Sequence, residues 1–161
     1  MMETSEERFV TWRERVGWMI GIGDKLILLA GYMQLGVVIG SFAVPFLLNW
    51  RSELAAIRKL TRQVFWTYAA YVLGTNLFFA ILSISLTSSL TDGSELATAM
   101  CSFIALYWAA RLGIQFFYFD KKGLPSGGIY QIGEWLLVVC FLFFTIVYSG
   151  AAYVNGWGMH G

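Results

Sequence analysis

The stretch WLLVVCFLFFTIVY, residues 135–148, decides the fold class of this chain. It contains no charged residue and lies inside a longer apolar run, at about residues 130–154. A helix needs roughly 20 apolar residues to cross the hydrocarbon core of a bilayer. Because lipid offers the backbone no hydrogen-bond partner, a run of this length is satisfied as a helix and not as a strand. The stretch therefore predicts a membrane-spanning α-helix.

Three further apolar runs precede it, at about residues 26–48, 64–87 and 97–119. The composition agrees, because 58% of the 161 residues are hydrophobic and only 13% are charged. A soluble domain carries roughly 25% charged residues. We therefore expect an all-α fold, in which residues 1–161 form a single transmembrane domain of four helices that run up and down through the bilayer.

Two segments outside these runs have amphipathic patterns. Residues 5–20 place apolar side chains at helical spacing among arginines, which predicts a helix that lies in the membrane interface. Gly21 and Gly23 are expected to let the chain turn from it into the bilayer. The connector, residues 51–63, is expected to form a second short interfacial helix. Its cations are expected to bind lipid headgroups, and they are Arg51, Arg58, Lys59 and Arg62.

The charges of the loops predict an orientation. The loops at residues 49–63 and 120–128 are basic, whereas the loop that contains Asp92 and Glu95 is acidic. By the positive-inside rule, the two basic loops are cytoplasmic and both termini lie outside. Arginines in the N-terminal segment weaken this contrast. We expect an integral protein of a bacterial inner (plasma) membrane.

One of the four runs contains a charged residue well inside it. Arg111 lies in the third run, with polar residues one turn before it and one turn after it. Glu134, near the start of the fourth run, should reach a similar level once the chain turns back. An ionisable side chain within a span is by default a candidate for function. The candidate binding residues are Tyr107, Arg111, Gln115, Tyr118, Tyr130 and Glu134.

The sequence leaves the role of Arg111 and Glu134 open. They can form a structural clamp that fixes the packing of the third and fourth helices. They can instead belong to a polar cavity, open to the cytoplasm, that binds an anion, a lipid headgroup or a proton. A third interpretation is an arginine that only extends to a lipid phosphate.

Other residues in the runs predict details of packing. Asn76 is expected to bond another helix, since it lies near the middle of the second run. Gly36 and Gly40 have GxxxG spacing, for which we expect packing within the chain rather than between copies. Pro45 is expected to kink or end the first helix.

The sequence lacks the usual signatures of catalysis and of metal or cofactor binding. It has one histidine, His160, and two cysteines, Cys101 and Cys140, without a CxxC pair. One histidine cannot supply a Ser/His/Asp set or bis-histidine haem ligation, and the cysteines are expected to pack as free apolar side chains. We therefore expect no catalytic residue, no metal site and no cofactor. The net charge of +1 gives no reason to expect nucleic acid as a partner.

Two stretches resemble a group of small four-helix membrane proteins that are uncharacterised open reading frames in bacteria. One is VPFLLNWRSELAAIRKLTRQVFWTY, residues 44–68, with the run WRSEL at residues 50–54. The other is FIALYWAARLGIQFFYFD, residues 103–120, with the run RLGIQF at residues 111–116. The resemblance covers about residues 30–120 and implies the four-helix membrane fold. It implies no activity, because none is established for that group.

These observations favour a non-enzymatic membrane protein, either a subunit of a larger membrane assembly or a small homo-oligomer. Its partners would be membrane lipids and other copies or membrane subunits. One alternative is an oligomeric channel or small transporter, with a polar pathway at Arg111, Gln115 and Glu134. Another is a membrane enzyme or accessory protein that binds a lipid or a quinone against Tyr107, Arg111 and Tyr130.

Overall fold

The computed structural model describes residues 5–47, 49–117 and 128–158, and the secondary structure in these ranges is helical. Each of the four long helices contains a stretch that is long and apolar enough to cross a membrane. The structure therefore confirms the four candidate spans. The long helices are α1 (Ser5–Ser41), α4 (Lys59–Ser85), α5 (Glu95–Phe117) and α6 (Gly128–Gly158).

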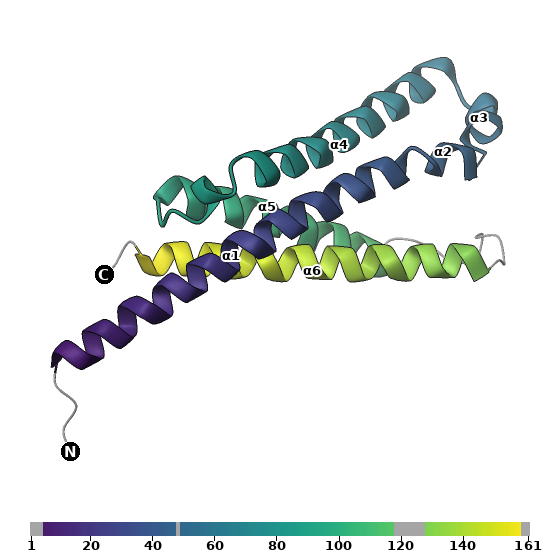
Figure 1. Ribbon diagram of the computed structural model, residues 1–161. Helices are drawn as coiled ribbons and strands as arrows, with labels where there is room; N and C mark the ends of the chain where they lie inside the picture. Colours follow the sequence, from purple (N-terminus) through teal and green to yellow (C-terminus); the bar gives the residue numbers. More distant parts are fainter. Residues whose placement is uncertain (1–4, 48, 118–127, 159–161) are drawn as a thin grey trace.

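The first long helix begins differently from its prediction. The prediction of a turn at Gly21 and Gly23 is wrong, because α1 continues through both glycines without interruption. A glycine costs a helix about 1 kcal/mol relative to alanine, but its backbone still makes the helical hydrogen bonds. Figure 1 shows the N-terminal part of α1 continuing past the ends of the other helices.

The end of α1 agrees with the prediction made from Pro45. A proline ring clashes with the carbonyl group of the residue four positions earlier. That residue is Ser41, where α1 ends. The chain then forms short helical turns, in the order α2 (Val44–Leu47), α3 (Trp50–Glu53) and η1 (Leu54–Ala56).

The connector does not form the single helix that was predicted over residues 51–63. Its first part belongs to α3 and η1, and Ile57 is extended, with a φ of −97° and a ψ of 158°. Its second part opens α4, which begins at Lys59. The second long helix therefore begins before the apolar run, since lysine and arginine are good helix formers.

The long helices pack as two neighbouring pairs, α1 with α4 and α5 with α6, and α1 crosses α6 where the pairs meet (Figure 1). Gly31 lets α1 approach α4 closely, because a Cβ atom there would lie 2.8 Å from Cγ1 of Ile84 and 3.2 Å from its backbone nitrogen. The core between the pairs is aromatic and includes the buried rings of Phe79, Trp108 and Phe144. The ring centres of Trp108 and Phe144 lie 4.8 Å apart.

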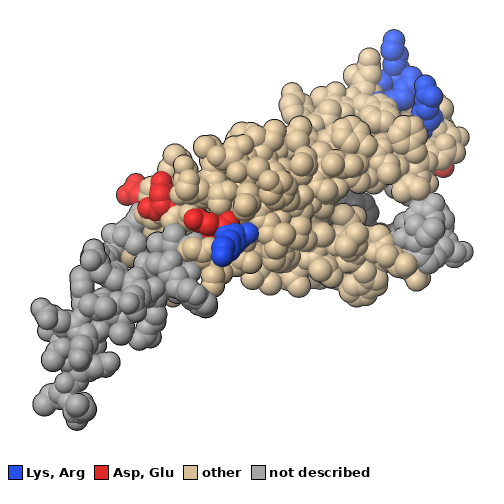
Figure 2. Space-filling model, viewed as in Figure 1, with Lys and Arg blue, Asp and Glu red and all other residues tan. Residues whose placement is uncertain are grey.

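Among the described side chains, most cations lie at one end of the bundle and most carboxylates at the other (Figure 2). The basic end, where α3 leads into α4, carries the cations that were predicted to bind headgroups, Arg51, Arg58, Lys59 and Arg62. The acidic end, where α4 leads into α5 through the short turn η2 (Ser88–Leu90), carries Asp24, Asp92 and Glu95, together with Lys25.

Candidate functional site

The polar stripe predicted on α5 makes a hydrogen-bonded contact with α4. The hydroxyl of Tyr107 donates to Oδ1 of Asn76 at 2.6 Å. The hydroxyl oxygen of Tyr107 in turn accepts hydrogen bonds from Nε and Nη2 of Arg111, at 3.3 Å and 3.2 Å. The guanidinium carbon of Arg111 also lies 5.5 Å from the centre of the Tyr107 ring, within the range of a cation–π contact. The prediction that Asn76 bonds another helix is confirmed.

In the described part of the chain, Nε and Nη2 of Arg111 both bond the hydroxyl of Tyr107. Residues four positions apart are already neighbours on a helix, so this contact needs no approach of α6. Gln115 and Glu134 are half-buried, on α5 and α6 respectively. Tyr118 and the side chain of Tyr130 lie outside the described part of the chain, as do residues 118–127.

A second polar cluster lies in the apolar core, and its contacts were not predicted from the sequence. Nε2 of Gln34, on α1, donates to the hydroxyl of Tyr148, on α6, at 2.6 Å. That hydroxyl lies 2.5 Å from Oγ of Ser83, on α4. The Ser83 hydroxyl itself donates to the carbonyl oxygen of Phe79, so the proton between the two hydroxyls belongs to Tyr148. These three buried side chains tie α1, α4 and α6 together.

A third set of polar contacts closes the acidic end. The hydroxyl of Thr91 donates to the carboxylate of Asp24 and joins the loop between α4 and α5 to α1. Asn155, on α6, is only 2% exposed. Its Nδ2 donates to the carbonyl oxygen of Leu90 at 2.7 Å, and its Oδ1 accepts from the backbone N–H of Gly93 at 3.1 Å. The loop is therefore held against both α1 and α6.

Residues 92–94 set the local conformation of this loop. Gly93 has a φ of 76°, in the left-handed region that favours glycine. Hydrogen bonds from the side chain and backbone N–H of Ser94 lower the pKa of the Asp92 carboxyl, which favours its charged form. The hydroxyl of Ser94 also accepts from the backbone N–H of Ala97, which caps the start of α5.

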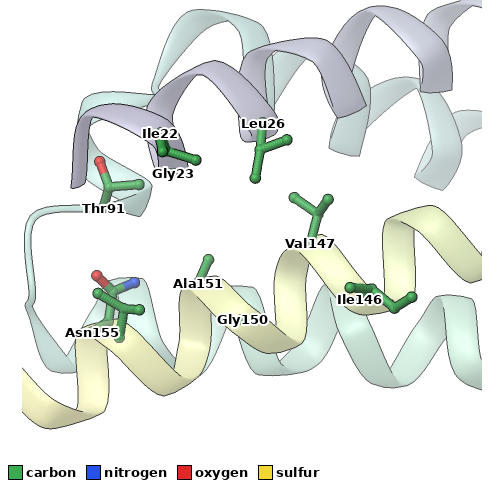
Figure 3. Close-up of a pocket in the computed structure, with 10 residues that line it drawn as sticks. Ile22, Gly23, Leu26, Thr91, Ile146, Val147, Gly150, Ala151 and Asn155 are labelled. Atoms are coloured by element: carbon green, nitrogen blue, oxygen red, sulfur yellow. The ribbon is translucent and has the colours of Figure 1, made fainter. Parts of the chain in front are cut away.

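A groove of about 330 Å³ lies between α1 and α6 at the acidic end, and we call it the α1–α6 groove. Figure 3 shows Leu26 and Val147 extending toward one another from the two helices, with Thr91 and Asn155 at one end. Most of the wall is apolar, and the small residues of α6 leave room within it. The lining residues are Ile22, Gly23, Leu26, Thr91, Ile146, Val147, Gly150, Ala151, Val154 and Asn155.

The GxxxG glycines of α1 face away from the packed core. Gly36 and Gly40 are both exposed, and a Cβ atom at either position would meet nothing within 4 Å. The expectation that they pack within the chain is therefore wrong for the described residues. Gly31 makes the close contact between α1 and α4 instead.

The first half of α4 has no fully buried residue in the described part of the chain. The buried residues of this helix begin at Asn76, so residues 59–75 contribute none. Tyr68 is 67% exposed and Tyr71 is 70% exposed. Near the basic end Trp50 and Trp66 lie with their ring centres 5.9 Å apart, and Trp50 also contacts Phe65.

The reactive side chains of the described residues are dispersed. Cys101 and Cys140 are free and buried, as predicted, and the thiol of Cys101 donates to the carbonyl oxygen of Leu90 at 3.5 Å. The described residues hold no group of three or more His, Cys, Asp or Glu that could bind a metal ion. The features left to interpret are the polar contacts between helices, the outward faces of α1 and α4, and the α1–α6 groove.

Comparison with known proteins gives no match, whether to a family model, to a curated protein or to a solved structure. The resemblance to the small four-helix membrane proteins therefore rests on the residues quoted for it.

Proposed function

We propose that this chain is a non-enzymatic integral protein of a bacterial inner membrane that crosses the bilayer four times, up and down. In this proposal α1 and α4 bind a second copy of the chain or another membrane subunit. The observation that carries it is the open space over Gly36 and Gly40, which lie in the candidate span Gly21–Leu47. Small residues at this spacing let the backbone of another helix come close, and such faces are common where membrane helices associate.

The exposed half of α4 supports the same proposal. Tyr71 lies twelve residues after Lys59, about 18 Å along the helix at 1.5 Å per residue. Tyrosine is enriched at the membrane interface and not at this depth. Because a hydroxyl without a partner is costly in hydrocarbon, Tyr71 is better satisfied against a partner helix than against lipid.

Native mass spectrometry in a mild detergent tests this proposal, since it reports copy number and partner subunits together. Gly36→Ile and Gly40→Ile should convert the assembly to smaller species, because a branched side chain keeps the partner backbone away. Each should still fold, because the space over these glycines is open. Gly113→Ile, at another glycine with nothing within 4 Å, is the matched control. Unchanged masses for the Gly36 and Gly40 variants would overturn the proposal.

We further propose that the basic end faces the cytoplasm and that both termini lie outside. The separation of Arg51, Arg58 and Lys59 from the carboxylates of the acidic end supports this, by the positive-inside rule. Single cysteines at the exposed positions Ser52 and Ser89 test it with a maleimide that does not cross membranes. In intact cells Ser89→Cys should react, whereas Ser52→Cys should react only after lysis. The reverse pattern would contradict the orientation.

A second candidate function, binding of an anion or lipid headgroup at Arg111, is favoured by one observation. A guanidinium has five N–H donors. Within the described chain, Nε and Nη2 of Arg111 both donate to the same neutral acceptor, the hydroxyl oxygen of Tyr107. Such a cation suits a phosphate. Arg111→Gln should then lose bound phosphatidylglycerol in native mass spectra, whereas Arg111→Lys should keep part of it.

The channel alternative makes a different prediction for the same residue. If Arg111, Gln115 and Glu134 line a pathway, Arg111→Ala should abolish ion flux in liposomes while expression stays unchanged. Unchanged flux would remove this alternative and leave headgroup binding.

A further inference from the structure

We infer that the α1–α6 groove holds one acyl chain of a phospholipid whose zwitterionic headgroup lies at the acidic end. The residues that line the groove on α1 and α6 fall within the candidate spans Gly21–Leu47 and Gln131–Trp157. The medium around this part of the molecule is therefore hydrocarbon. An apolar groove left empty forfeits dispersion contacts along its wall, and an acyl chain restores them without desolvating a polar group.

The direction of the groove suits an acyl chain. Along α6 its lining runs over residues 146–155, which is about 13 Å at 1.5 Å per residue. One end lies at the polar side chains of Thr91 and Asn155, and the other lies deeper, at Ile146 and Val147 (Figure 3). The groove therefore runs along the helix, from the level of the loop into the span. An acyl chain with its headgroup at the surface takes the same course.

Two small residues create the space. Gly150 and Ala151 both line the groove, and a Cβ atom on Gly150 would meet nothing within 4 Å. A larger side chain at either position would occupy the volume that we assign to the lipid. The volume of about 330 Å³ is at the lower end of the range for small-molecule sites, roughly 300–1,000 Å³, so it suits one chain rather than a whole lipid.

The charges at the mouth favour a zwitterionic headgroup over an anionic one. Lys25 is exposed and lies with Asp24 in a neighbouring hollow between α1 and the end of α4, not in the groove itself. The carboxylate of Asp24 accepts a hydrogen bond from the hydroxyl of the groove residue Thr91, so this hollow adjoins the polar end of the groove. Asp92 follows Thr91 in the sequence and is exposed. Carboxylates beside the cation attract an amine and repel a second negative charge. Phosphatidylethanolamine has this charge pattern, whereas phosphatidylglycerol lacks the amine.

Native mass spectrometry with equal amounts of added phosphatidylethanolamine and phosphatidylglycerol tests the inference. The unaltered chain should retain phosphatidylethanolamine preferentially. Gly150→Leu and Ala151→Leu should lower its occupancy by about tenfold, as expected for the loss of a few buried methylene contacts. Gly133→Leu, at a glycine of the same helix that also has nothing within 4 Å, should retain the lipid.

Two further measurements separate this inference from a folding defect and from the proposed association. The thermal midpoint of Gly150→Leu in detergent should not fall, since leucine favours a helix more than glycine does. Gly36→Ile should keep the bound lipid even if it dissociates the assembly, because Gly36 does not line the groove.

Lys25→Gln should reduce the preference for phosphatidylethanolamine. The inference is overturned if both groove variants fold and still retain the lipid, or if the unaltered chain retains no phosphatidylethanolamine. Equal retention of the two lipids by Arg111→Gln, which lacks the other proposed headgroup site, would overturn the headgroup assignment.

Discussion

Gln34 of α1 and Tyr148 of α6 are 114 residues apart in the sequence, yet they share a buried hydrogen bond of 2.6 Å. The same phenol oxygen lies 2.5 Å from Oγ of Ser83 on α4. One tyrosine hydroxyl therefore joins three of the four long helices. A polar contact of this kind is specific in a way that apolar packing is not, because it fixes the rotation of each helix about its axis.

Tyr148→Phe should destabilise the fold by about 1–2 kcal/mol, since it leaves the Nε2 group of Gln34 buried without its partner. Oε1 of Gln34 already has no hydrogen-bond partner among the described residues, so the amide would lose its remaining contact. Reversible unfolding in mixed micelles measures the change. Gln34→Leu is the control and should cost less, because Tyr148 keeps its bond to Ser83. Equal losses for the two variants would contradict this account.

Gly31→Ala should destabilise the pairing of α1 with α4. The added Cβ atom would lie 2.8 Å from a side-chain carbon of Ile84 and 3.2 Å from its backbone nitrogen. Overpacking of this kind costs about 1–3 kcal/mol, which the same unfolding measurement would report. Gly36→Ala has open space and should be neutral or stabilising, by up to about 1 kcal/mol. If Gly31→Ala were also neutral, the two helices would not be in close contact there.

Asn155→Ala should loosen the loop at the acidic end without unfolding the bundle. It removes the acceptor of the Gly93 backbone N–H and a donor to the Leu90 carbonyl group. Each hydrogen bond contributes about 0.5–1.5 kcal/mol, so hydrogen exchange at the Gly93 amide should accelerate by about two- to tenfold. Asn76→Ala, which removes a polar contact elsewhere on α4, should leave that amide unchanged. Equal acceleration in both variants would mean that the effect is global.

The sequence was sufficient to predict the number of long helices, their approximate ranges and the end of α1 near Pro45. Length and apolarity are enough for this, because the bilayer fixes both. It was insufficient for the start of α1, where a glycine pair typical of a turn lies inside a continuous helix. Glycine lowers the stability of a helix but does not by itself end one.

Sequence reasoning found Tyr107, Arg111 and Asn76 as polar residues in apolar runs, but it did not find the bonds among Gln34, Ser83 and Tyr148. In a soluble helix the apolar face identifies the side that packs. In a membrane the lipid-facing and core-facing sides are both apolar, so periodicity does not show which way a side chain turns. The GxxxG glycines illustrate this, since Gly31 and not Gly36 lies against α4.

The pairing of the helices has a consequence for biogenesis. α1 and α4 are the first two long helices, so this pair can form early during synthesis, whereas α5 can pair only with the last helix, α6. The contact between Gln34 and Tyr148 has a far greater sequence separation and must wait until the last helix has entered the membrane. Until then the amide of Gln34 lacks its native acceptor in a medium that offers no water. A chain truncated before α6 should therefore be a preferred substrate for membrane quality control, with Gln34 as one of the exposed polar groups.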